Sequence, residues 1–423
     1  MTLSGILKST LLIAVLFIGW LPVPSRAFGL LAHEAIIDAL WEKSIKPLLK
    51  QKYPGATEEQ LKKAHAFVYG GSIIPDIGYY PLGSPEFSSL LHYVRSGDFV
   101  TALLDESRNL NEYGFALGVL CHYEADRYGH SLATNKAVAI LFSKLKKKYG
   151  NDVTFEQGRD QHARVEFGFD VLQVAKGNYQ SEAYHDFIGF EISDSVLERA
   201  FVNTYGIKLD KIFKSFPAAV SLFRFSVRVI IPELTEDAWR IKNSFITQLN
   251  PLATEKTFHY KMDRRKYQKE FPHPKVQSFF ISLVIAVLPK YGPLSRFKPK
   301  MPSPECETLF EHSFDEILVH YAATMQRLGN KGMAYANIDL DTGLKTDQEE
   351  YRLTYKAYYK LLMNLQHSKF ASVDEALKRD FTAYYSKHES HGYAANSHKG
   401  KKIRLALVAL HDLHPAVVVG KAL

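Results

Sequence analysis

The chain has 423 residues, of which 46% are hydrophobic and 23% are charged, a composition typical of a globular protein with one large domain or two. Its formal net charge of +8 tolerates anionic surfaces but does not by itself indicate nucleic-acid binding. The two cysteines, Cys121 and Cys306, exclude a disulfide-rich scaffold and leave open whether they pair.

The first 27 residues have the pattern of a secretory signal peptide. Lys8 precedes an apolar segment at about residues 11–23, and Ser-Arg-Ala at 25–27 has the small-x-small form of a cleavage site. An uncleaved membrane anchor is the alternative, but the apolar segment is short for one. We therefore expect export to the periplasm, the cell surface or the medium, with a mature chain that begins at Phe28.

Helical periodicity dominates the rest of the chain, since apolar residues recur at spacings of three and four and alternating strand patterns are scarce. We therefore predict an all-α fold. The predicted division is a catalytic domain at 28–250, a basic and apolar connecting segment at 251–300 and a helical extension at 301–423. The apolar stretch at 276–292 is short for a bilayer span and indicates a buried helix or a segment at a membrane surface.

One predicted helix, at residues 115–134, carries His122, Asp126 and His130 at intervals of four residues, so the three side chains share one face. His162 and Glu166 repeat this spacing further along the chain. A single histidine on a helix is most often structural. Two His-x-x-x-acid pairs with a third aligned histidine instead indicate a metal site, because such pairs reach one ion without rearranging the backbone. Imidazole and carboxylate together suit zinc.

Other motifs are absent or incomplete. The chain has no phosphate-binding loop of the G-x-x-x-x-G-K-[ST] type, no G-x-S-x-G and no H-E-x-x-H. Asp339, Asp341 and Glu350 loosely match a calcium-binding loop, but the glycine comes one place early. His-Asp dipeptides at 185–186 and 411–412 raise the alternative of a helical phosphohydrolase of the HD type, without a supporting set nearby.

The order of these features resembles the bacterial zinc-dependent phospholipase C family, whose superfamily includes fungal single-strand-specific zinc nucleases. The resemblance covers about residues 28–200 and rests on His33, the Pro-Asp pair at 75–76, LLHYVRSGDFV at 90–100, FALGVLCHYEADRYGH at 115–130 and HARVEFGFD at 162–170. The remaining half matches loosely, as a helical extension.

The resemblance implies a site with three zinc ions. One ion would bind the backbone amine and carbonyl of Phe28 with His33, a second would bind Asp76, His92 and His122 with Asp126 bridging these two ions, and the third would bind His130, His162 and Glu166. It also suggests that Asp76 orients or deprotonates the attacking water. Two features depart from the family. Phe28 stands where the family usually has Trp, and the bridging acid is the shorter Asp126, which is typical of the nucleases.

The resemblance implies hydrolysis of a phosphodiester by water that zinc activates. We expect phospholipid hydrolysis of the phospholipase C type, with peripheral membrane contact and no stable nucleic-acid partner. A single-strand nuclease or nucleotidase on the same site, and a non-catalytic exported protein that binds zinc or lipid, are the alternatives. Tyr79, Tyr80 and Phe87 are candidates for contact with a choline cation or a nucleobase; packing in the core or the loop is the other interpretation.

Overall fold

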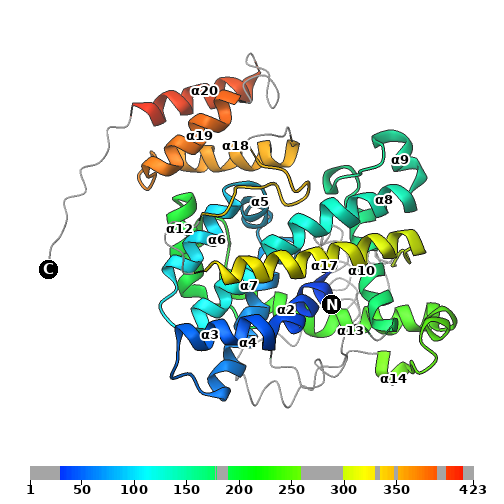
Figure 1. Ribbon diagram of the computed structural model, residues 1–423. Helices are drawn as coiled ribbons and strands as arrows, with labels where there is room; N and C mark the ends of the chain where they lie inside the picture. The colour runs from blue at the N-terminus through cyan, green and yellow to red at the C-terminus, as the bar shows by residue number, and fades with distance from the viewer. Residues whose placement is uncertain are drawn as a thin grey trace, which may run out of the picture.

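The computed structural model describes residues 29–176, 178, 189–258, 299–328, 334–346, 351–387 and 397–412. Helices dominate these ranges, which contain no β-strand and only one isolated bridge, between Ile338 and Lys345 (Figure 1). The all-α prediction is confirmed. The predicted signal peptide at 1–27 and Phe28 lie outside the described residues, as does most of the connecting segment.

The helices follow one another through short loops. The α-helices are α2 (Leu30–Leu40), α3 (Lys46–Lys52), α4 (Glu58–Ile73), α5 (Pro85–Tyr93), α6 (Ser96–Glu106), α7 (Leu110–Tyr128), α8 (Asn135–Leu141), α9 (Ser143–Tyr149), α10 (Arg159–Lys176), α12 (Asp194–Tyr205), α13 (Phe216–Leu249), α14 (Glu255–Phe258), α17 (Pro304–Gln326), α18 (Arg352–His367), α19 (Glu375–Lys387) and α20 (His398–His411). Short 3-10 helices are η2 (Ile74–Tyr79), η4 (Phe155–Gln157) and η5 (Leu209–Lys211), and the π-helical segments are η1 (Trp41–Ile45) and η3 (Gly129–Thr134).

The starts of several helices are set by capping side chains. Thr57 and Gln60 form a capping box at α4, and the side chains of Ser84, Asn109 and Ser303 accept hydrogen bonds from backbone N–H groups at the starts of α5, α7 and α17. Such caps satisfy N–H groups that have no partner within the helix. The local sequence therefore fixes where these helices begin.

Helix α7 crosses α4 at very short range. A Cβ atom at Gly118 of α7 would lie 2.0 Å from the carbonyl oxygen of Val68, and one at Gly71 of α4 would lie 2.1 Å from that of Phe115. Only glycine leaves room for two helix backbones this close. The crossing brings the C-terminal end of α4 against the middle of α7.

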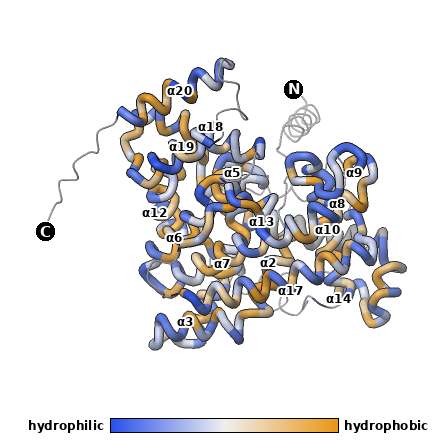
Figure 2. The backbone as a smooth tube through the Cα atoms, turned by 45° about the horizontal axis from the view of Figure 1, so that its top comes forward, coloured by the Kyte–Doolittle hydropathy of each residue, from blue (hydrophilic) through white to orange (hydrophobic). Residues whose placement is uncertain are grey.

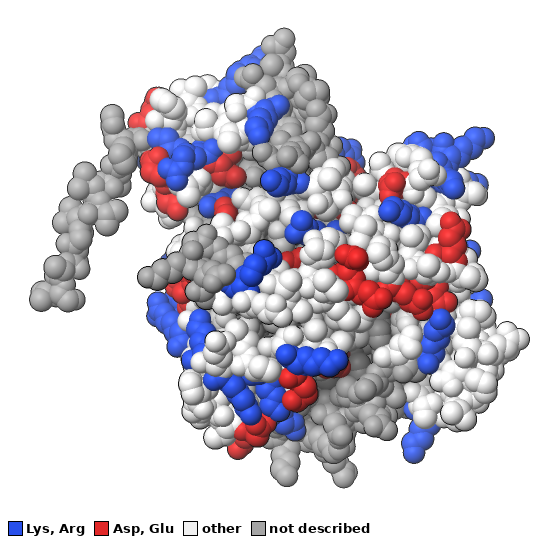
Figure 3. All heavy atoms as spheres, viewed as in Figure 1, with Lys and Arg blue, Asp and Glu red and all other residues white. Residues whose placement is uncertain are grey.

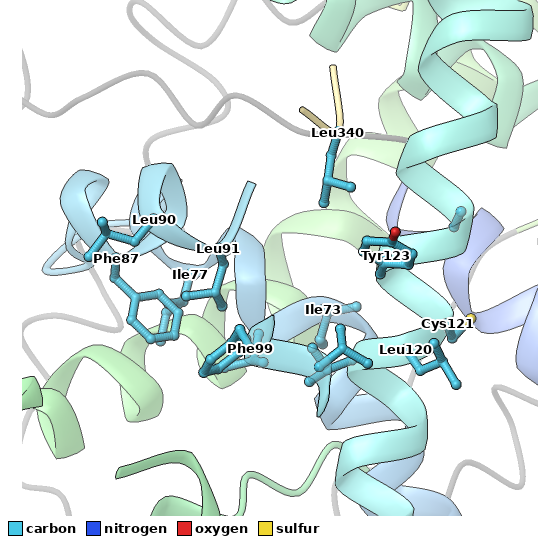
Figure 4. Packing of buried hydrophobic residues seen from close by; sticks show 14 of the residues in the cluster. Ile73, Ile77, Phe87, Leu90, Leu91, Phe99, Leu120, Cys121, Tyr123 and Leu340 are labelled. Carbon is cyan, nitrogen blue, oxygen red and sulfur yellow. The ribbon is translucent and has the colours of Figure 1, made fainter. Parts of the chain in front are cut away.

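The core lies around this crossing. Figure 4 shows its side chains converging from α4, η2, α5, α6 and α7, among them Ile73, Ile77, Phe87, Leu90, Leu91, Phe99, Leu120, Cys121, Tyr123 and Leu340. Cys121 and Cys306 are both buried and free, so they do not pair.

The C-terminal part of the chain belongs to the same core. Tyr321 of α17 donates a hydrogen bond to the carbonyl of Leu117 on α7 at 2.8 Å. The segment 334–346 packs on α6, where the hydroxyl of Ser96 donates to the carbonyl of Ile338 at 2.7 Å. The predicted helical extension from residue 301 thus contributes its first part to the core around α7. Helices α18, α19 and α20 form the group at the top of Figure 1.

The helices are amphipathic, and apolar and polar residues alternate along most of the backbone in Figure 2. Within the described ranges, no helix combines the length and the apolar character that a membrane crossing requires. The apolar stretch at 276–292 lies outside those ranges, so its two interpretations stay predictions.

Candidate metal centre

The three aligned residues of the predicted helix lie on one buried face. Helix α7 carries His122 and Asp126, and it changes into the π-helical segment η3 at Gly129, one residue before His130. The Oδ2 atom of Asp126 is 3.2 Å from Nε2 of His122 and 4.0 Å from Nε2 of His130. Local π-helical segments are frequent at functional sites.

Asp126 is the hub of the centre. Besides His122, its carboxylate faces Nε2 of His33 on α2 at 3.5 Å and Nε2 of His92 on α5 at 3.3 Å. Neither oxygen of this fully buried carboxylate makes a hydrogen bond of good geometry within the described residues. Histidines from three helices therefore converge on one carboxylate.

Backbone carbonyls orient the rings of His92 and His122. Nδ1 of His92 lies 2.7 Å from the carbonyl oxygen of Ser88, and Nδ1 of His122 lies 2.9 Å from that of Ser72. With Nδ1–H donated to these carbonyls, both rings present Nε2 to the centre, and the two Nε2 atoms are only 3.3 Å apart. Asp76 of η2 completes this group, with Oδ1 3.4 Å from Nε2 of His92.

A separate group forms where α10 meets η3. His162 and Glu166 lie one turn apart on α10, with Nδ1 of His162 3.7 Å from Oε1 of Glu166. Nε2 of His162 donates to the carbonyl of Val153 at 2.6 Å, so Nδ1 is the atom available to a ligand. Both nitrogens of His130 and both oxygens of Glu166 are buried without a hydrogen-bond partner in the described chain. Leaving such atoms unsatisfied costs several kcal/mol, which a bound cation would offset.

The described ligand candidates thus form three buried groups, in each of which the ligand atoms lie within 4.8 Å of one another: His33, His122 and Asp126; Asp76, His92 and His122; and His130, His162 and Glu166. Every predicted side-chain ligand belongs to one of them. The pattern differs from the predicted one in a detail, since His122 faces two groups and its ring stacks on that of His33 at 4.7 Å. Phe28 lies outside the described residues.

The electrostatics of the groups favour metal binding. Burial, helped by neighbouring His122, lowers the pKa of His33 to about 4, and burial with His130 nearby lowers the pKa of His162 to about 3. Both rings are therefore neutral at pH 7, the form that binds zinc. Burial opposes ionisation of Asp126, but the surrounding histidines, His122 foremost, hold its pKa well below the usual range.

Of the three aromatic candidates, one lies at the centre. The ring of half-buried Tyr79 is 6.0 Å from that of His92 in an edge-to-face arrangement. Tyr80 is buried and packs on Phe223, and Phe87 is fully buried between aromatic rings of the neighbouring helices. The hypothesis that Tyr80 and Phe87 contact substrate is therefore wrong, because both rings belong to the core.

The remaining motifs are occupied otherwise. Asp339 accepts a hydrogen bond from the hydroxyl of Thr354 at 2.6 Å, and Asp341 accepts from Tyr93 at 2.9 Å and from Tyr351 at 2.6 Å, so protein donors take up the acids of the suspected calcium loop. His411 and Asp412 are exposed at the end of α20. Glu350 and the other His-Asp dipeptide, at 185–186, lie outside the described residues.

The segment 334–346 is a part of the centre that sequence reasoning missed. The backbone N–H of Leu340 donates to the carbonyl of His92 at 3.1 Å, directly behind a candidate ligand. Tyr93, the residue after His92, is held by Asp341. No local pattern signals this contact, because 248 residues separate the two partners.

Comparison with known proteins agrees with this geometry. Residues 32–214 match the family model described as zinc dependent phospholipase C. The matched range contains every candidate side-chain ligand and ends before α17 and the segment 334–346. No curated protein and no solved structure matches the chain.

Proposed function

Because residues 32–214 belong to the zinc-dependent phospholipase C family, we propose that the chain hydrolyses phospholipids to diacylglycerol and a phosphorylated head group. One observation carries the proposal: eight buried imidazole and carboxylate side chains converge in three adjacent groups, several with unsatisfied ligand atoms. A structural zinc site is usually closed by four protein ligands, whereas each group here has three, as in catalytic sites.

The donor set fits zinc, which prefers imidazole nitrogen and carboxylate oxygen. We propose three ions: one with His33 and the backbone of Phe28, one with Asp76, His92 and His122, and one with His130, His162 and Glu166, where Asp126 lies between the first two. When bound, zinc supplies a Lewis acid that polarises a phosphodiester and produces a nucleophile from water at neutral pH.

The residues of the chain supply orientation and proton transfer. Asp76 is 7% exposed whereas Asp126 is fully buried, so Asp76 is the carboxylate of this pair that substrate and water can approach. A carboxylate oxygen of Asp76 takes the proton of the attacking water. The partly exposed ring of Tyr79, held beside His92, contacts the head group of the substrate.

Direct comparison of substrates tests this proposal. The zinc-loaded chain, produced from Phe28, is incubated with phosphatidylcholine vesicles and with single-stranded DNA at equal concentrations of phosphodiester. We expect release of phosphocholine without DNA cleavage. Efficient DNA cleavage without lipid hydrolysis would instead favour the nuclease, for which the short bridging acid Asp126 is the supporting observation. Absence of both activities in a chain that binds zinc would favour the non-catalytic alternative.

Export is part of the proposal, because it would create the N-terminal ligand. His33 is fully buried in the first turn of α2, where its backbone N–H bonds to the carbonyl of Gly29 at 3.2 Å, so residue 28 is joined directly to the segment that carries a ligand. A free amine is a good zinc ligand and an amide nitrogen is a poor one. We expect a chain with a Gly-Ser extension before Phe28 to bind two zinc ions instead of three, as measured by atomic emission. Equal zinc content and activity in both chains would exclude the amine as a ligand.

A further inference from the structure

A cavity of about 520 Å³ lies between α2, α10 and α17, and no candidate zinc ligand lines it. These three helices lie near one another in Figure 1. The volume falls within the range of sites for small organic molecules, roughly 300–1,000 Å³. The cavity is therefore large enough for an organic ligand and separate from the residues of the metal centre.

Two buried polar side chains at this cavity have hydrogen-bonding atoms without partners among the described residues. Glu34 is 2% exposed, and its Oε1 accepts no hydrogen bond. Gln173 is also 2% exposed; its Oε1 accepts from Asn178 at 2.5 Å, but its Nε2 donates to no group. Buried unpaired groups are costly. Glu34 lacks a donor and Gln173 lacks an acceptor, so a ligand that carries both would satisfy the pair.

The rest of the wall is aromatic and acidic, with Phe310, Phe314, Asp38, Glu311 and Asp315. Helix α17 contains five acidic residues and no Lys or Arg, and Figure 3 shows an acidic strip over it. Lys176 offsets part of this charge, through an ion pair with Glu311 at 3.5 Å. The surplus is still negative, so the cavity favours cations and repels anions. Aromatic rings stabilise organic ammonium groups further.

The same features argue against a metal ion. The acidic side chains of the cavity do not gather into a group of potential ligands anywhere in the described part of the chain. Phenylalanine rings offer no ligand atom. The width of the cavity and its mixed wall therefore suit an organic cation.

We propose that the cavity binds a small aminated polyol, that is, an amino alcohol or an amino sugar. The ammonium group donates to Oε1 of Glu34, and a hydroxyl oxygen accepts from Nε2 of Gln173. A phosphorylated form binds more weakly because the acidic rim repels it. The inference is independent of the proposed hydrolase activity, since it concerns other residues and is tested by binding alone.

Isothermal titration calorimetry on the zinc-loaded full chain tests the ligand class. The probes are glucosamine, glucose and N-acetylglucosamine at about pH 6.5, where the free amine is protonated. We expect glucosamine to bind at least about tenfold more tightly than either neutral analogue, and than glucosamine 6-phosphate. Equal binding of glucose and glucosamine, or stronger binding of the phosphate, would overturn the proposal.

Variants locate the binding to this cavity. Glu34→Gln keeps the size of the side chain and removes its charge, and it should weaken glucosamine binding at least about tenfold. The same change at exposed Glu59 on α4 should have no effect. If Glu34→Gln does not fold, Ala35→Leu fills the cavity without changing charge and should also abolish binding. Zinc content is measured in each variant, so damage to the metal centre is recognised separately. Unchanged binding in Ala35→Leu would exclude the cavity.

Discussion

Glu166 on α10 is fully buried, and neither of its oxygens accepts a hydrogen bond from the described residues. Burial raises the pKa of this carboxyl well above its usual range, and the nearby carboxylates, Asp126 first, add to the rise. A carboxylate in this position is stabilised by a cation, and it has no other partner in the described chain. At the scale of single residues, Glu166 is therefore the most direct probe of the third zinc ion.

We expect Glu166→Gln to lose one zinc ion per chain and about 100-fold in hydrolysis of phosphatidylcholine. The variant should fold as well as the original chain, because it replaces a buried acid with a neutral side chain of the same size. Zinc content by atomic emission and thermal unfolding by circular dichroism measure the two effects. Glu42→Gln, at an exposed position on η1, is the matched control. Full zinc content in Glu166→Gln would contradict the assignment.

The buried histidines predict how the stability of the zinc-depleted chain depends on pH. An unfolded histidine binds a proton below about pH 6.5, whereas folded His33 does so only near 4 and folded His162 only near 3. Between these values the unfolded state holds more protons, so the free energy of unfolding falls as the solution is acidified. The contribution is absent above pH 6.5 and grows down to the folded pKa.

His162→Gln isolates one of these contributions. After removal of zinc with a chelator, urea unfolding at pH 7 and pH 4 should show a smaller loss of stability in the variant, by about 2–3 kcal/mol. His367→Gln, at an exposed position at the end of α18, should keep the original pH dependence. An identical loss in His162→Gln and the original chain would show that His162 is not held neutral by burial.

At the scale of elements, the crossing of α4 and α7 controls the position of His122. Gly118 lies one turn before His122, and Ser72, whose carbonyl orients the His122 ring, lies next to Gly71. Because a Cβ at Gly118 would approach the Val68 carbonyl to 2.0 Å, any side chain there must separate the two backbones. The close crossing thus serves the metal centre as well as the core.

Gly118→Ala should therefore lower the free energy of unfolding by about 3 kcal/mol and reduce zinc affinity as well. Denaturant unfolding and competition with a chromogenic chelator measure the two effects. Gly55→Ala is a suitable control, because no atom lies within 4 Å of a Cβ at that position. A Gly118→Ala chain with unchanged zinc affinity would show that the crossing does not position His122.

The elements also show which parts of the centre the sequence could reveal. His122 with Asp126, and His162 with Glu166, are partners on one helix, so their spacing alone predicted that they act together. His33, Asp76 and His92 come from separate elements, and only the family resemblance joined them to the rest. Tyr80 and Phe87 were misassigned, since sequence position near a site does not determine whether an aromatic ring points into the site or into the core.

At the scale of the whole molecule, the matched family range is not a self-sufficient unit. Residues 32–214 contain the candidate side-chain ligands, but α17 packs on α7 through Tyr321 and on α10 through Phe310, whose ring is 4.7 Å from that of Phe169. The segment 334–346 supports the backbone of His92 from behind. The predicted boundary near residue 250 followed a change in composition along the chain, which carries no information about contacts between residues some 200 positions apart.

A chain that ends at residue 258 should therefore fail to fold cooperatively, even though it retains every candidate side-chain ligand. It would expose the apolar surface of α7 and α10 that α17 covers, and it would leave the carbonyl of His92 without the Leu340 donor. A chain that ends at residue 346 keeps both contacts and lacks only α18–α20, so we expect it to bind more zinc than the shorter chain and to unfold in a single transition. Urea unfolding, followed by tryptophan fluorescence, and zinc content distinguish the two chains. Cooperative unfolding and a full complement of zinc in the chain that ends at 258 would show that the C-terminal helices are an accessory to the metal centre and not a part of its support.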